Sequence, residues 1–212
     1  MRTLIVANGA EPPSWLLGRL ARCCSTIIAA DGGAAVLLRE NIVPDVVTGD
    51  MDSFTPPEEF SAEVLPNPDQ ETNDLEKALS LALSLKSTRV DVLGATGKRL
   101  DHSLKNLSVL HQFSPLFQAL AFFDKHLYSC ILPRTFSIRL PVSHPVSLFP
   151  LSGRVDGICT SGLLYALNNE FLENGVRDGS SNLTTQPDIT ITHRFGTLLF
   201  MTALTDSLIE DH

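Results

Sequence analysis

The sequence predicts an α/β fold, with an N-terminal Rossmann-like α/β domain built on a parallel sheet and a C-terminal all-β sandwich or barrel domain. In the first part of the chain, short apolar runs alternate with helical patterns, as is typical of parallel strands covered on both faces. In the second part, prolines separate short strand-like runs and helical periodicity is lost. The 212 residues accommodate both parts, so we expect an α/β domain over residues 1–132 and a β domain over residues 133–212.

The composition is that of a globular protein, with 43% hydrophobic and 19% charged residues. The net charge of −8 argues against a nucleic-acid partner, because surfaces that bind nucleic acid cluster Lys and Arg. The four cysteines lack the spacing of a metal site, and the adjacent pair Cys23-Cys24 is a poor start for a disulfide framework. Reduced thiols and a cytoplasmic location are therefore expected. No segment approaches the roughly 20 apolar residues of a membrane span, so no membrane association is expected.

The strands and helices of the α/β domain are predicted from apolar runs and their boundaries. The first strand stops at Asn8-Gly9, and Pro12-Pro13-Ser14 then opens a helix, as proline near a first turn often does. Strands are expected at Thr3–Ala7, Ser25–Ala30, Pro44–Thr48, Val90–Leu93, Leu120–Phe123 and Leu127–Leu132. Helices are expected at Trp15–Cys23, Ala34–Glu40 and Leu75–Leu85, and from Asp101 onward, where leucines recur at helical spacing.

Polar clusters that contain glycine follow three of these strands, at Asn8-Gly9, Asp31-Gly32-Gly33 and Gly49-Asp50. Ligands of open α/β sheets bind beyond the carboxyl ends of the strands, so the shared position of the clusters predicts a binding site there. Asp50 and Asp52 are two residues apart, and in extended backbone both carboxylates would point to one face. Such a pair repels unless a proton or cation lies between its members, and oxygen ligands suit Mg²⁺. The simpler alternative is a solvated Asp-x-Asp turn.

Two later segments add polar groups. Asn73 can cap the following helix, with Glu76 completing a capping box, and a helix N-terminus also suits phosphate. The stretch Gly94–His102 contains glycines and the cationic Lys98 and Arg99, but it lacks the spacing of a Walker P-loop.

Five aspartates of the α/β domain lie near strand ends or helix starts, and no cluster of His or Cys accompanies them. This donor set favours Mg²⁺ and phosphoryl transfer over zinc hydrolysis. The five are Asp31, Asp50, Asp52, Asp74 and Asp101.

The β domain is read from short strand-like runs with turn residues between them. Gly179–Asn182 is its most polar stretch and is expected to be a loop. Strands are expected at Ser147–Leu151, Arg154–Thr160, Leu163–Leu167, Asp188–Thr192 and Thr197–Thr202.

These segments together resemble the thiamine pyrophosphokinase family over nearly the whole chain. The matching stretches are Ala30–Ala34, Gly49–Ser53, Asp69–Leu79, Gly94–His102 with Leu104 and Asn106, Thr160–Leu167 and Gly179–Asn182. The resemblance implies transfer of a diphosphoryl group from ATP to the hydroxyl of thiamine, which gives thiamine diphosphate and AMP. It also implies a homodimer with active sites at the subunit interface.

The resemblance assigns roles to individual residues. Mg²⁺ would be held, and the triphosphate organised, by Asp50, Asp52, Asp74 and Asp101. ATP would be contacted by Asp31, Gly32, Gly33, Gln70, Lys98 and Arg99. Thiamine would be bound by Tyr165, which would stack on its pyrimidine ring, and by Ser181 and Asn182, which would hydrogen-bond that ring. Tyr165 could equally be a half-buried strand aromatic.

Two positions depart from the pattern of the family. Asn73 stands where many relatives have Thr, and Lys98 stands where many have the second Gly of Gly-Gly-Arg. Neither removes a carboxylate, so activity is expected to survive. Two alternatives remain: a diphosphokinase for another hydroxymethyl heterocycle such as a pterin, and a non-catalytic nucleotide- or thiamine-binding module. A dinucleotide-binding Rossmann protein is disfavoured, since no G-x-G-x-x-G follows the first strand.

Overall fold

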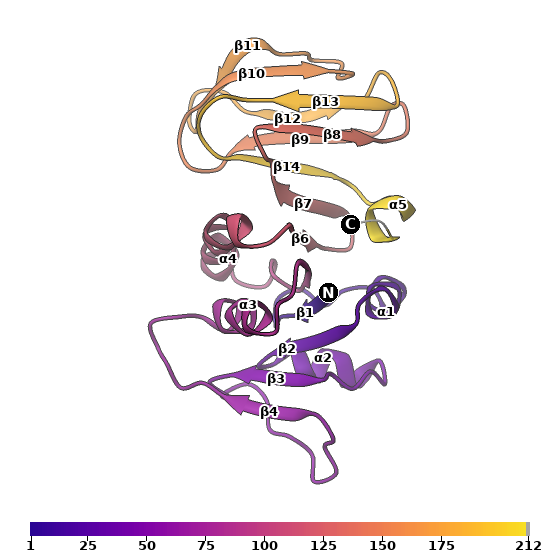
Figure 1. The fold of residues 1–212 in the computed structure, drawn as a ribbon, viewed down its shortest axis with the longest axis vertical. Coiled ribbons are helices and arrows are strands. Elements are labelled where there is room, and N and C mark those ends of the chain that lie inside the picture. Colours follow the sequence, from indigo (N-terminus) through magenta and orange to yellow (C-terminus); the bar gives the residue numbers. More distant parts are fainter. Residues whose placement is uncertain (211–212) are drawn as a thin grey trace. The chain divides into compact units, whose positions relative to one another are not determined.

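The computed structural model describes residues 1–210 and divides the chain into two compact units (Figure 1). The first comprises residues 1–125 together with the segment from Asp206, and the second comprises residues 126–205. This division differs from the predicted boundary at residue 132 by one strand. The strand predicted at Leu127–Leu132 is present as β7 (Leu127–Ile131), and the division assigns it to the second unit, where it pairs antiparallel with β14 (Leu198–Ala203).

The first unit is built on parallel strands in the order β6-β5-β1-β2-β3-β4. The central strands are mostly apolar and mostly buried, as parallel strands covered on both faces should be. The strands are β1 (Arg2–Val6), β2 (Thr26–Ala30), β3 (Val46–Gly49), β4 (Glu63–Pro66), β5 (Arg89–Leu93) and β6 (Ala119–Phe123). The sequence did not predict β4, a four-residue edge strand with one residue of intermediate burial and three exposed.

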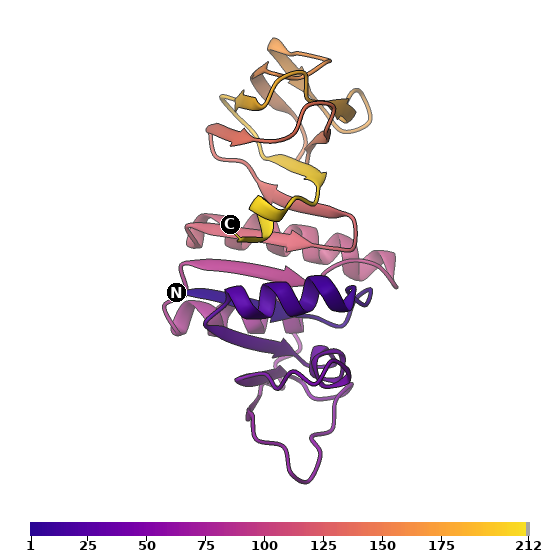
Figure 2. The same ribbon diagram turned by 90° about the vertical axis from the view of Figure 1, so that its right-hand side faces the viewer.

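Helices cover both faces of this sheet, as predicted. Figures 1 and 2 show α1 and α2 on one face and α3 and α4 on the other. Their bounds are α1 (Ser14–Cys23), α2 (Gly33–Arg39), α3 (Asp74–Ser84) and α4 (Leu100–Phe113), followed by the short 3₁₀ turn at Ser114–Leu116. The last helix, α5 (Asp206–Glu210), packs against α1. Among the described residues, no helix has the length and apolar character needed to cross a membrane.

The order of the strands places a crevice in this unit. From β1 the chain proceeds through β2 to β3 in one direction along the sheet, whereas from β5 it proceeds to β6 in the other. The direction of winding therefore switches between β1 and β5, and the loops beyond the carboxyl ends of these two strands diverge. In open α/β sheets this is where ligands bind.

The second unit is an all-β sandwich whose strands all pair antiparallel. Within this unit, the strands pair side by side in two groups, in the orders β12-β9-β14-β7 and β11-β10-β13-β8. The rings of Phe136 on β8 and Phe200 on β14 lie 5.3 Å apart between the sheets. The remaining bounds are β8 (Thr135–Arg139), β9 (Pro145–Pro150), β10 (Val155–Ser161), β11 (Asn168–Leu172), β12 (Gly179–Leu183) and β13 (Asp188–Thr192).

Two predictions for the second unit were wrong. Leu163–Leu167 is irregular, with a single bridge between Leu163 and Thr184. The backbone N–H and oxygen of Tyr165 bond to the side chain of Asn182, so the pairing does not continue as a strand. Gly179–Asn182, expected to be a loop, belongs to β12, an edge strand on β9. An edge strand with mostly exposed polar residues lacks the apolar alternation by which strands are recognised.

His193 makes the stability of the second unit depend on pH. The ring is buried, and its Nδ1 has no hydrogen-bond partner among residues 1–210. Burial lowers the pKa of His193, and the charge of Arg134 adds to this shift. As the pH falls below about 6.5, the unfolded state takes up a proton that the folded state resists, so the free energy of unfolding should fall. Urea unfolding of the wild type and His193→Leu at pH 7 and pH 5 tests this: the variant should lose less stability, and equal losses would contradict it.

Candidate active site

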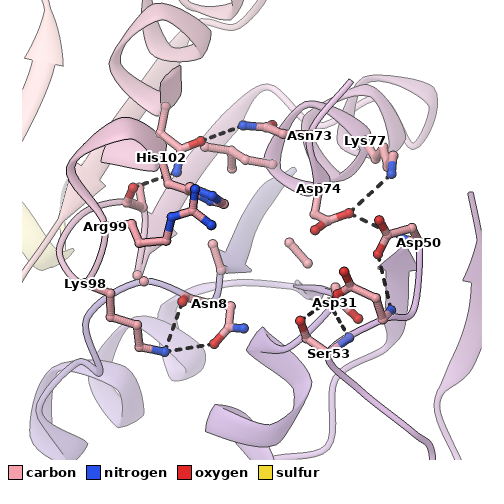
Figure 3. Close-up of a pocket in the computed structure, with 18 of the residues that line it drawn as sticks. Asn8, Asp31, Asp50, Ser53, Asn73, Asp74, Lys77, Lys98, Arg99 and His102 are labelled. Atoms are coloured by element: carbon pink, nitrogen blue, oxygen red, sulfur yellow. Dashed lines mark hydrogen bonds and ion pairs between the residues drawn. The ribbon is translucent and has the colours of Figure 1, made fainter. Parts of the chain in front are cut away.

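A pocket of about 530 Å³ opens at the carboxyl ends of the parallel strands in the first unit (Figure 3). Its walls come from the loops after β1, β2, β3 and β5, from the loop before α3, and from the first turns of α3 and α4. The pocket therefore lies where the strand order and the polar clusters of the sequence predict a ligand site.

Three carboxylates from different segments meet in this pocket. Asp31 follows β2, Asp50 follows β3, and Asp74 is the first residue of α3. One carboxylate oxygen of each lies within 4.8 Å of the others. Figure 3 shows the three side chains around one region of the pocket, with Asp74 above, Asp31 below and Asp50 to the right. The fold thus concentrates three negative charges in one place.

Asp31 is the most enclosed of the three, with 2% of its surface exposed. Its Oδ2 accepts a hydrogen bond from the backbone N–H of Ser53 at 3.1 Å, whereas its buried Oδ1 has no partner in the described chain. Burial raises the pKa of Asp31, and the charge of Asp74 adds to that effect. A buried carboxylate oxygen without a partner makes the ionised form of Asp31 unfavourable, and a cation bound beside it would stabilise that form.

Gly49 keeps the space between these carboxylates open. Its φ of +149° favours glycine, and a Cβ at this position would lie 2.7 Å from the Cβ of Asp31 and 3.0 Å from Oδ1 of Asp74. The three carboxylates, the unpaired oxygen and the space left by Gly49 fit a divalent cation that prefers oxygen ligands, such as Mg²⁺.

Lys77 supplies a positive charge beside the cluster. Its side chain is 2% exposed, and its Nζ lies 3.3 Å from Oδ1 of Asp74. The sequence interpretation assigned no role to this residue, although it lies in the matching stretch Asp69–Leu79. The Asp74-to-Lys77 spacing of three residues, which brings side chains together on a helix, was the available clue.

Asp52 and Asp101 lie outside the three-carboxylate cluster. Asp52 lines the pocket, but the backbone turns at Met51, whose φ is +65°, so the extended geometry expected for Asp50 and Asp52 is not present. Asp101 does not line the pocket. It pairs with Arg99 at 2.5 Å and 3.1 Å, and this contact lowers the pKa of Asp101 to about 2.

The predicted nucleotide-binding residues divide into two groups. Gln70, Lys98 and Arg99 line the pocket, and Lys98 Nζ donates to the backbone oxygen of Asn8 at 3.1 Å and to its Oδ1 at 3.0 Å. Gly32 and Gly33 do not line it. His102 and Asn8, which the sequence interpretation had not assigned to a ligand, also face the pocket in Figure 3.

A second pocket, of about 240 Å³, lies within the β-sandwich. Its floor is apolar, and its polar groups come from Tyr165, Arg177, Asp178 and Ser180 together with Asn182. Tyr165 is 66% exposed, which is inconsistent with a half-buried strand aromatic. Ser181 does not line the pocket.

The amide of Asn182 is occupied within the protein. Its Oδ1 accepts from the backbone N–H groups of Tyr165 and Leu183, and its Nδ2 donates to the backbone oxygen of Tyr165 at 2.9 Å. Asn182 therefore fixes the turn that presents Tyr165.

The chain is similar to known proteins over both units. Residues 17–121 match the model of the thiamin pyrophosphokinase catalytic domain, and residues 136–198 match the model of the thiamin pyrophosphokinase vitamin B1 binding domain. The chain belongs to the thiamin pyrophosphokinase family.

Individual members of the thiamin pyrophosphokinase family agree with this placement. Thiamine pyrophosphokinase 1 of Oryza sativa subsp. japonica is 29% identical over 172 residues, which is 73% of this chain and 64% of that protein. Thiamine pyrophosphokinase of Bacillus subtilis is 29% identical over 150 residues, which is 67% of this chain and 70% of that protein. A crystal structure of the Bacillus subtilis thiamine pyrophosphokinase aligns with a TM-score of 0.83 at 25% identity, covering 97% of this chain and 100% of that chain. The match thus spans about two thirds of the length of the curated relatives.

Charge repulsion in the carboxylate cluster should lower the thermal stability of this thiamin pyrophosphokinase family member when no metal is bound. In Asp31→Asn, the side-chain oxygen can still accept the hydrogen bond from the N–H of Ser53. The amide NH₂ replaces a carboxylate oxygen whose negative charge is repelled by Asp50 and Asp74, and it can donate to them. Without divalent metal, Asp31→Asn should therefore raise the midpoint of thermal unfolding by about 2–4 °C, or on the order of 1 kcal/mol.

Excess Mg²⁺ should reverse this order, because a ligand that binds only the folded state stabilises the wild type. Thermal unfolding with and without Mg²⁺ measures both effects. A metal-free variant that melts below the wild type would contradict charge repulsion in the cluster.

Proposed function

We propose that this protein transfers the diphosphoryl group of ATP to the hydroxyl of thiamine in a Mg²⁺-dependent reaction, giving thiamine diphosphate and AMP. The observation that carries this proposal is the cluster of Asp31, Asp50 and Asp74 in the pocket at the switch of strand order. Membership in the thiamin pyrophosphokinase family supplies the reaction and both substrates.

Within the pocket, we assign the metal to Asp31, Asp50 and Asp74, with Asp52 at its edge. When bound, Mg²⁺ neutralises charge on the phosphate oxygens of the nucleotide. The two residues Lys98 and Arg99 face the same pocket and would attract the polyphosphate. This places Asp31 among the metal ligands in addition to its predicted contact with ATP.

Asp101 receives a different role in this proposal. Asp101 pairs with the guanidinium of Arg99 at the N-terminus of α4. In this proposal Asp101 therefore positions a phosphate-binding group rather than holding metal. No general base is assigned, because three carboxylates share the region where the thiamine hydroxyl would be activated.

For thiamine, we propose that the exposed ring of Tyr165 stacks on the pyrimidine over the pocket of the β-sandwich. Asp178 and Ser180 offer hydrogen-bonding groups at the same pocket. Asn182 contributes by holding the Tyr165 turn, since its amide is already paired.

We further propose a cytoplasmic homodimer with active sites at the subunit interface. The dimer rests on the resemblance to the family, and the exposed apolar side chains of Tyr165, Val176 and Phe195 are compatible with an interface. The four free cysteines are compatible with a reducing compartment. Light scattering coupled to size-exclusion chromatography measures the oligomeric state directly.

A substrate panel tests the proposed function against its alternatives. The protein is incubated with ATP and Mg²⁺ together with thiamine or a hydroxymethyl pterin, and the products are separated by chromatography. Turnover of thiamine alone supports the proposal. Turnover of the pterin alone would assign the site to another hydroxymethyl heterocycle, and thiamine binding by calorimetry without any product would indicate a binding module.

A further inference from the structure

Asn73 makes two separate sets of hydrogen bonds at the start of α3, one with Glu76 and one with Asn106. Its Oδ1 accepts from the backbone N–H of Glu76 at 2.9 Å, and its own N–H donates to Oε2 of Glu76 at 2.9 Å, which is the capping box predicted from the sequence. Its Nδ2 points the other way and donates to Oδ1 of Asn106 on α4 at 2.8 Å (Figure 3 labels Asn73). A carboxamide can do both at once because its acceptor and its donor are different atoms.

Asn106 continues the connection. Its Nδ2 donates to the backbone oxygen of Ala95 at 2.7 Å, in the loop after β5. An ion pair also joins the same two helices: Nζ of Lys105 on α4 lies 2.9 Å from Oε2 of Glu76 on α3. Hydrogen bonds thus run without interruption from the residue before Asp74, through Asn106, to the Gly94–Lys98 loop.

The two ends of this connection have different tasks in the proposed function. Asp74 belongs to the carboxylate cluster, and the Gly94–Lys98 loop carries Lys98, which faces the pocket. Both Asn73 and Asn106 also line the pocket. Neither the capping box nor the carboxylate cluster by itself accounts for the Asn73–Asn106 contact.

We propose that the Asn73–Asn106 amide pair is a positioning element that holds Asp74 in register with the Gly94–Lys98 loop, so that the metal-binding and phosphate-binding sides of the pocket are set together. The proposal rests on the proposed function for its consequences in catalysis, but not for its effect on metal binding.

The first test separates the contact to Asn106 from the helix cap. Asn73→Ser keeps a good capping oxygen but is too short to reach Asn106. Mn²⁺ serves as the probe, titrated alone into the metal-free protein in a calorimeter. Because groups that orient metal ligands typically contribute 10–100-fold to metal affinity, Mn²⁺ binding should weaken by about tenfold. Unchanged Mn²⁺ affinity in Asn73→Ser would overturn the proposal.

The second test asks whether the two amides act as one unit. Asn106→Ala removes the same contact from the other side, and the double variant should bind Mn²⁺ about as weakly as Asn106→Ala alone. Losses that add in the double variant would overturn the coupling. Ser108→Ala, on the exposed face of α4, is the matched control and should bind Mn²⁺ like the wild type.

Measurements of kcat and KM for ATP then distinguish a role of Asn73 in positioning Asp74 from a general loss of protein stability. With ATP varied at saturating Mg²⁺, Asn73→Ser should raise KM for ATP by more than it lowers kcat, whereas kcat and KM unchanged from the wild type would contradict the proposal. If the protein has no diphosphotransferase activity, the proposed function fails, yet the Mn²⁺ measurements still decide whether the amide pair positions Asp74.

Discussion

Asp50→Asn is expected to reduce the rate of thiamine diphosphate formation about 10³-fold. Asp50 belongs to the cluster with Asp31 and Asp74, and its backbone N–H also donates to Oδ1 of Asp74 at 3.3 Å. An amide at this position removes a charge that holds the metal, and metal-assisted charge stabilisation contributes several kcal/mol, of which about 4 kcal/mol corresponds to 10³ in rate. The initial rate of AMP formation at several Mg²⁺ concentrations measures the effect.

The control for Asp50→Asn is Glu58→Gln, which removes one negative charge from an exposed loop of the same unit. Its rate should equal that of the wild type. Retention of more than a tenth of the wild-type rate by Asp50→Asn at all Mg²⁺ concentrations would mean that the carboxylate cluster does not hold the catalytic metal.

Gly33→Ala is expected to have the largest effect on stability, lowering the free energy of unfolding by about 3 kcal/mol, as a severe overpacking does. A Cβ on Gly33 would lie 1.9 Å from the backbone oxygen of Val6 and 2.6 Å from its carbonyl carbon. Val6 is fully buried on the central strand β1, so the backbone cannot yield without disturbing the sheet. In thermal unfolding, about 3 kcal/mol corresponds to a midpoint lower by roughly 10 °C.

Gly18→Ala provides the matched control for the Gly33 variant. Gly18 lies within α1, and a Cβ there would approach only the flexible end of Arg22, at 3.4 Å. This substitution should leave stability unchanged or raise it, because alanine favours helix over glycine by up to about 1 kcal/mol. Equal melting of Gly33→Ala and the wild type would show that α2 does not depend on close approach to β1.

Much of the first unit could be predicted because each local signal agrees with the global fold. Buried apolar runs stop at glycine, aspartate or asparagine, α3 begins with the Asn73 cap, and the polar clusters fall at the carboxyl ends of parallel strands. From these positions, Asp31 and Asp50 could be assigned to one site, because parallel topology brings the ends of β2 and β3 together. Asp74 was grouped with them as one of five aspartates near strand ends or helix starts.

The rest of the site geometry could not be predicted, because it depends on contacts distant in sequence or on unusual backbone. The left-handed conformation of Met51 cannot be read from Asp-x-Asp, and it takes Asp52 out of the extended arrangement. The pairing of Asp101 with Arg99 removes that carboxylate from the cluster, although its position in the motif suggested a ligand. Asn182 turns inward to hold Tyr165, a tertiary contact for which the sequence has no local signal.

The most direct test of the central claim is to identify both products formed from ATP, Mg²⁺ and thiamine in one reaction. If the carboxylate pocket carries out diphosphoryl transfer, AMP and thiamine diphosphate should appear in equal amounts, and both should be lost in Asp50→Asn. Formation of ADP with thiamine monophosphate would contradict this account, because it would show transfer of a single phosphoryl group.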